Sequence, residues 1–353
     1  ALNIKAEDVQ ELGPGNALIL KKNGTITEEN IIESTSKTAC TFERIYFSRG
    51  SDLDIYKERK NLGRSLVPQV MKAIESDHKN AVFSFIPNTA ETSFLGLVEG
   101  MNTLLNRQKS KKLVQLGTGI TQKQIEEILD QQIRVEKVAI KDAKLRTFIT
   151  QDDGRDDLVA HVYDITYGSI VPKKDALVMI DDSIVRGTTL EKSIIRMLDR
   201  LEPRKIVIVS SAPQIRYPDC YGIDMARMGD FIAFRAAVEL HKERGNEKIM
   251  KQVYIKAKEQ LALPMDQQIN VVKEIYSAFK MEEISTKVAE LVTPPDCKTA
   301  VEVIFQSIEG LHVACPNHSG DWYFSGNYPT PGGNRVVNKS YQYYYEGNNE
   351  RAY

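Results

Sequence analysis

The chain has 353 residues, of which 42% are hydrophobic and 27% are charged, a composition that supports a buried core and excludes a wholly disordered chain. Its 47 Lys and Arg residues almost balance its 48 Asp and Glu residues, which excludes a global field able to hold nucleic acid or an anionic membrane. No apolar run approaches the roughly 20 residues of a membrane helix, and no signal peptide is recognisable, so we expect a cytoplasmic protein without nucleic-acid or membrane partners.

The first part of the chain predicts β structure followed by a helix. Residues 16–24 form an apolar run that ends in an Asn-Gly turn signal, and residues 45–48 predict another strand. From residue 55 to residue 74, apolar positions recur at helical spacing, with Leu62 and Leu66 on one face. β structure with an Asn-Gly turn and one amphipathic helix are therefore expected before residue 80.

The middle of the chain alternates short apolar runs with amphipathic segments. We predict strands at 81–86, 176–180 and 205–211, and helices at 93–107 and 189–201. Strands that are apolar throughout and alternate with helices are typical of a parallel sheet covered on both faces. The expected fold class is therefore α/β, with a doubly wound parallel sheet.

The pattern changes beyond residue 224, where long charged helices are predicted at 247–261 and 270–291. Residues 320–353 are rich in Gly, Asn, Pro and Tyr, which favours a tail that lies on the surface or is partly mobile. We therefore expect three regions: a junction and β segment at 1–50, a core domain at 51–230, and a helical extension with its tail at 231–353.

The segment from Val178 to Thr189 carries the clearest chemistry. Its strand delivers Asp181 and Asp182 to the carboxyl edge of the sheet, where ligands of such folds collect. Paired carboxylates accept hydrogen bonds from sugar hydroxyls or approach a magnesium ion. The following residues are small or hydroxylic and open a helix, with a candidate capping box from Thr188 to Glu191, so backbone N–H groups there can cradle a phosphate. For the acidic pair taken alone, the alternative is that the two aspartates merely end a strand and the residues after them merely cap a helix.

These twelve residues together resemble the phosphoribosyl diphosphate (PRPP) binding motif of phosphoribosyltransferases. The likeness is greatest to glutamine PRPP amidotransferases, also called amidophosphoribosyltransferases, and covers most of residues 1 to about 230. Supporting matches are residues 40–49, 58–64, 146–149, 211–213, 217–218, 221–225 and 326–330. The resemblance implies a type I phosphoribosyltransferase-like fold.

The resemblance also implies roles for individual residues. Asp181 and Asp182 would hold the ribose hydroxyls and, with Thr89, a Mg²⁺ ion. The implied substrate-binding set is Asp181, Asp182, Ser183, Ile184, Val185, Arg186, Gly187, Thr188, Thr189, Asn88 and Thr89. Within it, Arg186–Thr189 would wrap the 5′-phosphate, and the loop at 86–90 would take the diphosphate. Lys141 and Arg146, beside the family's mobile active-site loop, are the implied catalytic residues.

Several positions depart from the family pattern. Ala90 stands where the family has a metal-binding hydroxyl, the family's basic segment before residue 146 is altered around Lys141, and the loop at 151–157 is acidic rather than basic. The chain also enters at what resembles the junction after the family's glutaminase domain. We therefore expect the synthase half of such an enzyme, a pentosyltransferase that makes 5-phosphoribosylamine from PRPP and ammonia in the first committed step of purine synthesis.

The expected partners follow from the same resemblance: ammonia from a glutaminase domain that is missing here, purine nucleotides as feedback ligands, and further copies of the chain. A weakened homologue that binds PRPP or a nucleotide for regulation is the main alternative. A salvage enzyme that couples PRPP to a base is a third, disfavoured by the match at 221–225.

The cysteines bear on a cluster that some family members carry. Cys40 matches one cluster ligand and Cys220 lies one residue from another, but Gly320 and Tyr323 occupy the remaining positions. Because a thiolate-bound cluster normally needs four ligands, we expect no iron–sulfur cluster and four free thiols.

Overall fold

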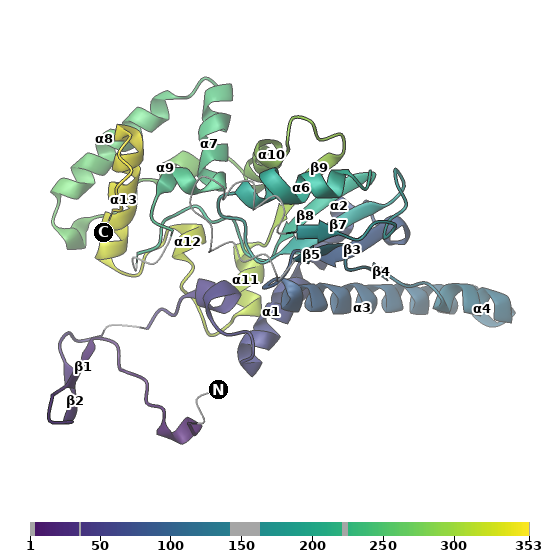
Figure 1. Ribbon diagram of the computed structural model, residues 1–353, viewed down its shortest axis with the longest axis horizontal. Coiled ribbons are helices and arrows are strands. Elements are labelled where there is room, and N and C mark those ends of the chain that lie inside the picture. Colours follow the sequence, from purple (N-terminus) through teal and green to yellow (C-terminus); the bar gives the residue numbers. More distant parts are fainter. Residues whose placement is uncertain (1–3, 35–36, 142–162, 221–224, 353) are drawn as a thin grey trace. The chain divides into compact units, whose positions relative to one another are not determined.

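The computed structural model of the chain describes residues 4–34, 37–141, 163–220 and 225–352, which divide into two compact units, Ala1–Ala39 and Cys40–Tyr353 (Figure 1). The first unit contains the short helix η1 (Ala6–Asp8) and an antiparallel hairpin of β1 (Asn16–Leu20) and β2 (Ile26–Asn30). The predicted Asn-Gly turn is confirmed, since Gly24 has φ 85° and donates its N–H to the carbonyl of Lys21. None of the described side chains of this unit is buried.

The second unit is built on a five-stranded sheet. Its strands are β3 (Ala81–Phe85), β4 (Arg134–Val135), β7 (Ala176–Asp181), β8 (Lys205–Ser210) and β9 (Ala300–Phe305). They pair in the order β4-β3-β7-β8-β9, and every pair is parallel. The predicted doubly wound parallel α/β fold is thus confirmed.

Alternate residues of the central strands face two separate cores. On one face, Phe83 and Val178 pack with side chains of α2 (Val67–Ala73) and α3 (Glu91–Leu116). On the other, Leu177 packs with α6 (Ile195–Asp199) and α10 (Met281–Val292). The strands are apolar throughout because helices cover both faces.

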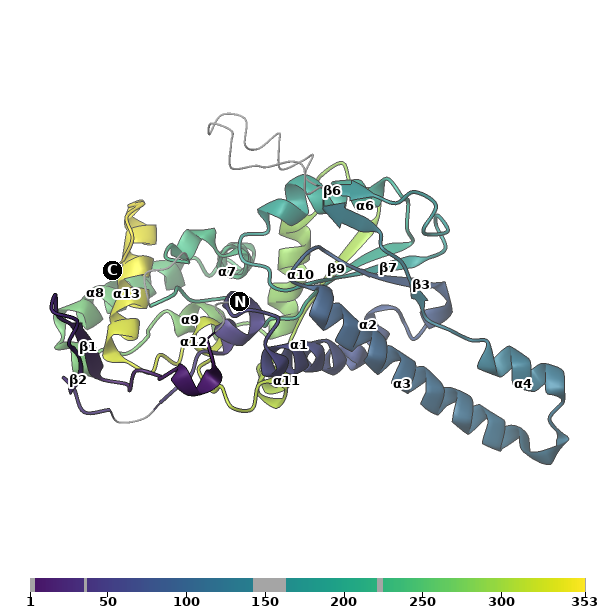
Figure 2. The same cartoon turned by 60° about the horizontal axis from the view of Figure 1, so that its bottom comes forward.

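The helix predicted at 55–74 is two helices, α1 (Leu53–Ser65) and α2, because Pro68 occupies the first turn of the second. Helix α3 is longer than predicted and lies beside α4 (Gln122–Leu129) (Figure 2). The Lys109 ammonium of α3 donates to the carbonyl of Leu129 in α4 (2.7 Å). The remaining elements before the C-terminal region are η3 (His78–Asn80), η4 (Gly117–Gly119), β5 (Ala139–Lys141), β6 (Tyr163–Ile165) and η6 (Leu190–Ile194).

The predicted strand at 45–48 is wrong. Residues 45–47 lie in the π-helical turn η2 (Glu43–Phe47), and Ser48 follows its end as the C-cap. Phe42 and Ile45 are buried at helical spacing, and the rings of Phe42 and Tyr46 stack across one turn. The burial of one helical face therefore outweighs the β propensity of these aromatic and branched residues.

The C-terminal region contributes more to the core than predicted. Strand β9 lies beyond residue 230 and forms the edge of the sheet, so the expected division at that residue does not coincide with the sheet. The predicted helix at 270–291 is interrupted between α9 (Lys273–Tyr276) and α10. The other elements are η7 (Met228–Asp230), α7 (Ile232–Glu243), α8 (Lys248–Ala262), η8 (Met265–Gln267), α11 (Ile308–Ala314), α12 (Trp322–Ser325) and α13 (Pro331–Glu346).

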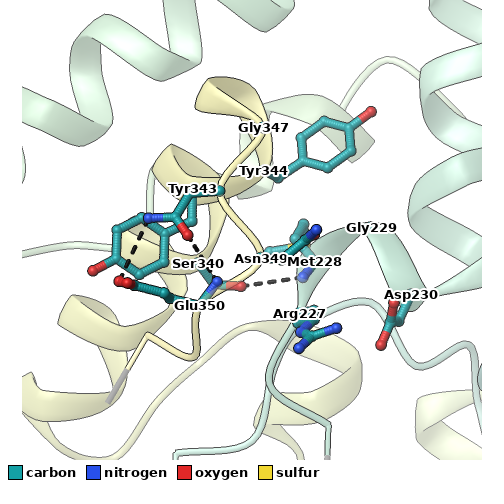
Figure 3. A pocket seen from close by; sticks show the side chains of 11 residues that line it. Arg227, Met228, Gly229, Asp230, Ser340, Tyr343, Tyr344, Gly347, Asn349 and Glu350 are labelled. Atoms are coloured by element: carbon teal, nitrogen blue, oxygen red, sulfur yellow. Dashed lines mark hydrogen bonds between the residues drawn. The ribbon is translucent and has the colours of Figure 1, made fainter.

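The prediction of a surface or mobile tail is also wrong. Trp322 and Tyr341 are fully buried, and the Ser340 hydroxyl accepts from Met228 N (3.1 Å) and donates to the carbonyl of Ala226 (2.9 Å). Figure 3 shows the tail from Ser340 onward packed against η7 around a cavity of about 90 Å³. No helix within the described residues is both long and apolar enough to cross a bilayer.

Candidate functional site

A cavity of about 670 Å³ opens where β3 and β7 end. It is lined by every predicted site residue within the described parts of the chain: Asn88, Thr89, Lys141 and all nine residues from Asp181 to Thr189. Arg146 and the acidic loop at 151–157 lie outside the described residues. The structure therefore brings the predicted acidic pair, phosphate loop and diphosphate loop into one cavity.

The acidic pair is held at the end of β7. Asp182 N donates to Asp181 Oδ1 (2.8 Å), and the Ser183 hydroxyl donates to Asp182 Oδ1 (3.0 Å). Burial raises the pKa of Asp181 well above its usual value, and the neighbouring charge of Asp182 raises it further. Burial also raises the pKa of Asp182, while hydrogen bonds from Ser183 and Thr89 act in the opposite direction. A bound cation would relieve the cost of ionising both carboxyls.

The loop after the acidic pair is fixed from outside the cavity. Ile232 N donates to the carbonyl of Val185 (2.8 Å), and Arg186 Nη2 lies 3.4 Å from Asp230 Oδ2. Gly187 has φ 75°, and a Cβ at this position would come 2.8 Å from Val292 Cγ1. The loop conformation therefore requires glycine at this position.

The predicted capping box from Thr188 to Glu191 does not form. Glu191 N instead donates to the carbonyl of Gly187 (3.0 Å), and the helix begins at Leu190 with no side-chain cap from Thr189. Because the carbonyl of Gly187 already accepts from Glu191 N, the Thr188 side chain is not needed as its acceptor.

Lys141 and Tyr163 line the cavity from the antiparallel strand pair β5–β6. Lys141 Nζ lies 5.8 Å from the centre of the Tyr163 ring, and the Tyr163 hydroxyl is 3.4 Å from the carbonyl of Pro87. Burial, followed by the charges of the acidic pair, raises the pKa of Tyr163 to about 12. Tyr163 thus stays a neutral phenol that joins β6 to the loop at 86–90.

Sequence reasoning missed one wall of the cavity and the residue behind it. Phe42, Tyr46 and Phe47 line the cavity from η2, with the rings of Phe42 and Phe47 edge to face at 5.2 Å. Behind them, Arg59 is only 5% exposed. The sequence signal that could have indicated its burial was its position four residues after Ile55, on the apolar face of the predicted helix.

Two of the four cysteines, Cys40 and Cys220, lie within electrostatic reach of each other. All four are free thiols, and burial raises the pKa of both Cys40 and Cys220 to about 11. Cys40 forms a backbone bridge to Gly320, and the Tyr323 side chain is buried. Across the described residues, no group of three or more His, Cys, Asp or Glu side chains is placed to hold a metal ion.

Comparisons with known proteins confirm the resemblance to amidophosphoribosyltransferases. The Pseudomonas aeruginosa enzyme of that name is 24% identical over 241 residues, 65% of this chain and 40% of the relative. The Lachancea kluyveri enzyme is 28% identical over 251 residues, 69% of this chain and 43% of the relative. No family model matches the sequence.

A solved structure shares the fold. The glutamine PRPP amidotransferase from Bacillus subtilis, complexed with ADP and GMP, aligns with a TM-score of 0.53 at 22% identity and covers 91% of this chain and 53% of the other. The present chain spans about two fifths of the length of the curated relatives that it matches. The relatives are transferases by name, in agreement with the expected enzyme class.

Proposed function

We propose that this chain binds PRPP in the 670 Å³ cavity and transfers its phosphoribosyl group to ammonia, giving 5-phosphoribosylamine for purine synthesis. The observation that carries the proposal is the convergence of the acidic pair, the phosphate loop and the loop at 86–90 on one cavity. The similarity to amidophosphoribosyltransferases supports the choice of substrate.

In this proposal the sugar phosphate is held by the end of β7 and the loop that follows it. Asp181 and Asp182 accept hydrogen bonds from the ribose hydroxyls, as ionised carboxylates do. The backbone N–H groups from Arg186 to Thr189 bind the 5′-phosphate, aided by the start of η6. The contacts of Val185 with Ile232 and of Gly187 with Val292 keep this loop in place before substrate arrives.

The donor set at the acidic pair fits magnesium held jointly with substrate. The Thr89 hydroxyl hydrogen-bonds the carboxylate of Asp182, which is next to Asp181. Mg²⁺ in phosphate-handling sites commonly takes one or two carboxylates together with substrate oxygens. Asp181, Asp182 and Thr89 would hold it. When bound, Mg²⁺ would neutralise charge on the diphosphate leaving group.

The proposed reaction forms a bond from ammonia nitrogen to C1 of the ribose and breaks the bond from C1 to the diphosphate oxygen. The bonding electron pair leaves with diphosphate, and the nitrogen releases one proton to solvent. Positive charge develops on the sugar ring, so the protein's contribution is to position the reactants and stabilise charge. Lys141 lies at the cavity where it can meet the leaving diphosphate. Arg146 is proposed to act in the same way.

One observation favours a second candidate, a homologue that binds PRPP or a nucleotide without turnover. Among the described residues that line the cavity, only Lys141 and Arg186 are basic, and Arg186 already lies beside Asp230. Few cations are therefore available for the leaving diphosphate.

The proposal also includes regulation by purine nucleotides, assembly with further copies of the chain, a glutaminase as the source of ammonia, and a cytoplasmic location.

Turnover separates the two candidates. Purified chain is mixed with PRPP, MgCl₂ and increasing ammonium chloride at a pH where free ammonia is present, and diphosphate release is followed. Release that rises with ammonia supports the transferase. Binding of PRPP without release favours the regulatory homologue, and absence of PRPP binding contradicts both. An Asp181→Asn preparation controls for contaminating enzymes.

A further inference from the structure

Arg59 ties the aromatic wall of the cavity to helix α1. Its Nε donates to the carbonyl of Arg44 (2.9 Å), and its Nη2 donates to the carbonyls of Tyr46 (3.2 Å) and Ser48 (2.8 Å). The last carbonyl groups of a helical turn have no N–H partner within that turn, so they need another hydrogen-bond donor. One guanidinium therefore satisfies three backbone acceptors along η2 and the residue that follows it.

The charge of Arg59 is not used in an ordinary ion pair. Its neighbour Glu58 pairs with Arg44 Nε instead, and both of those side chains are largely buried. No carboxylate of the described chain lies within ion-pair distance of Arg59 itself; the carboxylate that acts on it through space is Asp182 of the acidic pair. A buried cation bonded only to carbonyls is costly to keep. A guanidinium that bonds three carbonyls behind the wall and also feels the charge of Asp182 therefore calls for a role.

We infer that Arg59 is a positioning residue of this cavity: it fixes the turn that carries Tyr46 and Phe47 and so sets the aromatic wall of the cavity that the acidic pair also lines. The planar fork of a guanidinium reaches several acceptors at once, whereas a lysine ammonium on the same helix is a single point charge. Loss of the fork frees the carbonyls of residues 44, 46 and 48, and the wall then loses its fixed position. The part of the inference that concerns PRPP rests on the proposed function.

The matched control is Lys60, the next residue on α1. It is also basic and largely buried, but its ammonium pairs with Glu99 of α3 and does not contact η2. Lys60→Met therefore removes a cation from the same helix and leaves the wall intact. Arg59→Lys keeps the charge without the fork, and Arg59→Met removes both.

The first measurement is backbone hydrogen exchange without ligand. In Arg59→Met we expect the amides of residues 43–48 to exchange at least about tenfold faster than in wild type or Lys60→Met, which corresponds to the loss of one typical hydrogen bond. Thr41 N, which donates to the carbonyl of Gly320 (2.8 Å), should remain protected and serves as the internal reference. Equal exchange at 43–48 in Arg59→Met and Lys60→Met overturns the inference.

The second measurement is the PRPP concentration dependence of diphosphate release. We expect KM for PRPP to rise about tenfold or more in Arg59→Met and less in Arg59→Lys, with a smaller change in kcat, while Lys60→Met matches wild type. A fall in kcat at unchanged KM contradicts a positioning role. If wild type does not bind PRPP while exchange at 43–48 still responds to Arg59, the proposed function fails and the positioning of the wall stands. If Arg59→Met does not fold, Arg59→Lys decides by the same comparisons.

Discussion

Gly187→Ala tests whether the phosphate loop is held in place by packing from outside the cavity. Gly187 has φ 75°, a conformation that costs an L-residue about 1–2 kcal/mol. The added Cβ would also come 2.8 Å from Val292 Cγ1 and 3.3 Å from Ile232 Cγ1. Overpacking of this kind typically costs about 1–3 kcal/mol, so we expect a total loss of about 2–5 kcal/mol in the free energy of unfolding.

The chain contains a matched control for the backbone part of this cost. Gly245 has φ 64°, and an added Cβ there meets nothing within 4 Å. Gly245→Ala should therefore lose only the backbone cost, about 1–2 kcal/mol. Urea denaturation of both variants isolates the packing cost as the difference between them. Because Gly187→Ala displaces the loop, it should also weaken PRPP binding, whereas Gly245→Ala should not. Equal stabilities and equal affinities for the two variants would refute the idea that α7 and α10 fix the loop.

Three further predictions address the acidic pair, the tail and Lys141. Burial raises the pKa of Asp181, so the folded chain binds this proton more tightly than the unfolded chain, and the carboxyl lowers stability once the pH rises above its pKa in the unfolded chain. Asp181→Asn should therefore stabilise the ligand-free protein near pH 7. In denaturation curves, this gain in stability should shrink toward pH 4. Ser340→Ala removes the hydroxyl that bonds both Met228 N and the carbonyl of Ala226, and it should lower the free energy of unfolding by about 1–3 kcal/mol, measured by thermal unfolding. An unchanged unfolding midpoint would contradict the idea that α13 stabilises η7 through this hydroxyl. Lys141→Met should raise KM for PRPP severalfold in the diphosphate assay, and an unchanged KM would remove Lys141 from the site.

The sequence was most informative where local pattern and tertiary packing agree. Strands β7 and β8 are buried on both faces, so their apolar runs were visible without any knowledge of neighbours. The segment from Asp181 to Thr189 is contiguous, and a strand end followed by a helix start fixes where its groups lie. Its residues, together with Asn88 and Thr89, could therefore be assigned to one edge of the sheet.

The sequence was least informative where distant segments decide the local structure. Residues 45–48 have strand-like composition, yet Arg59 and Glu58 of α1 hold their neighbourhood as a π-helical turn. Strand β9 is half-exposed at the sheet edge, so its apolar signal was weak. The tail lacks an apolar period, but its aromatic side chains fill the space around η7 and α7, a contact that no local pattern reveals.

Calorimetric titration of PRPP with MgCl₂ into the purified chain, and into a variant carrying both Asp181→Asn and Asp182→Asn, tests the central claim most directly. We predict saturable binding at one site in the wild type and a loss of affinity of about 100-fold or more in the variant, since two charge-assisted contacts are removed. Equal affinity in the two proteins, or no binding in either, would contradict a PRPP site at the end of β7.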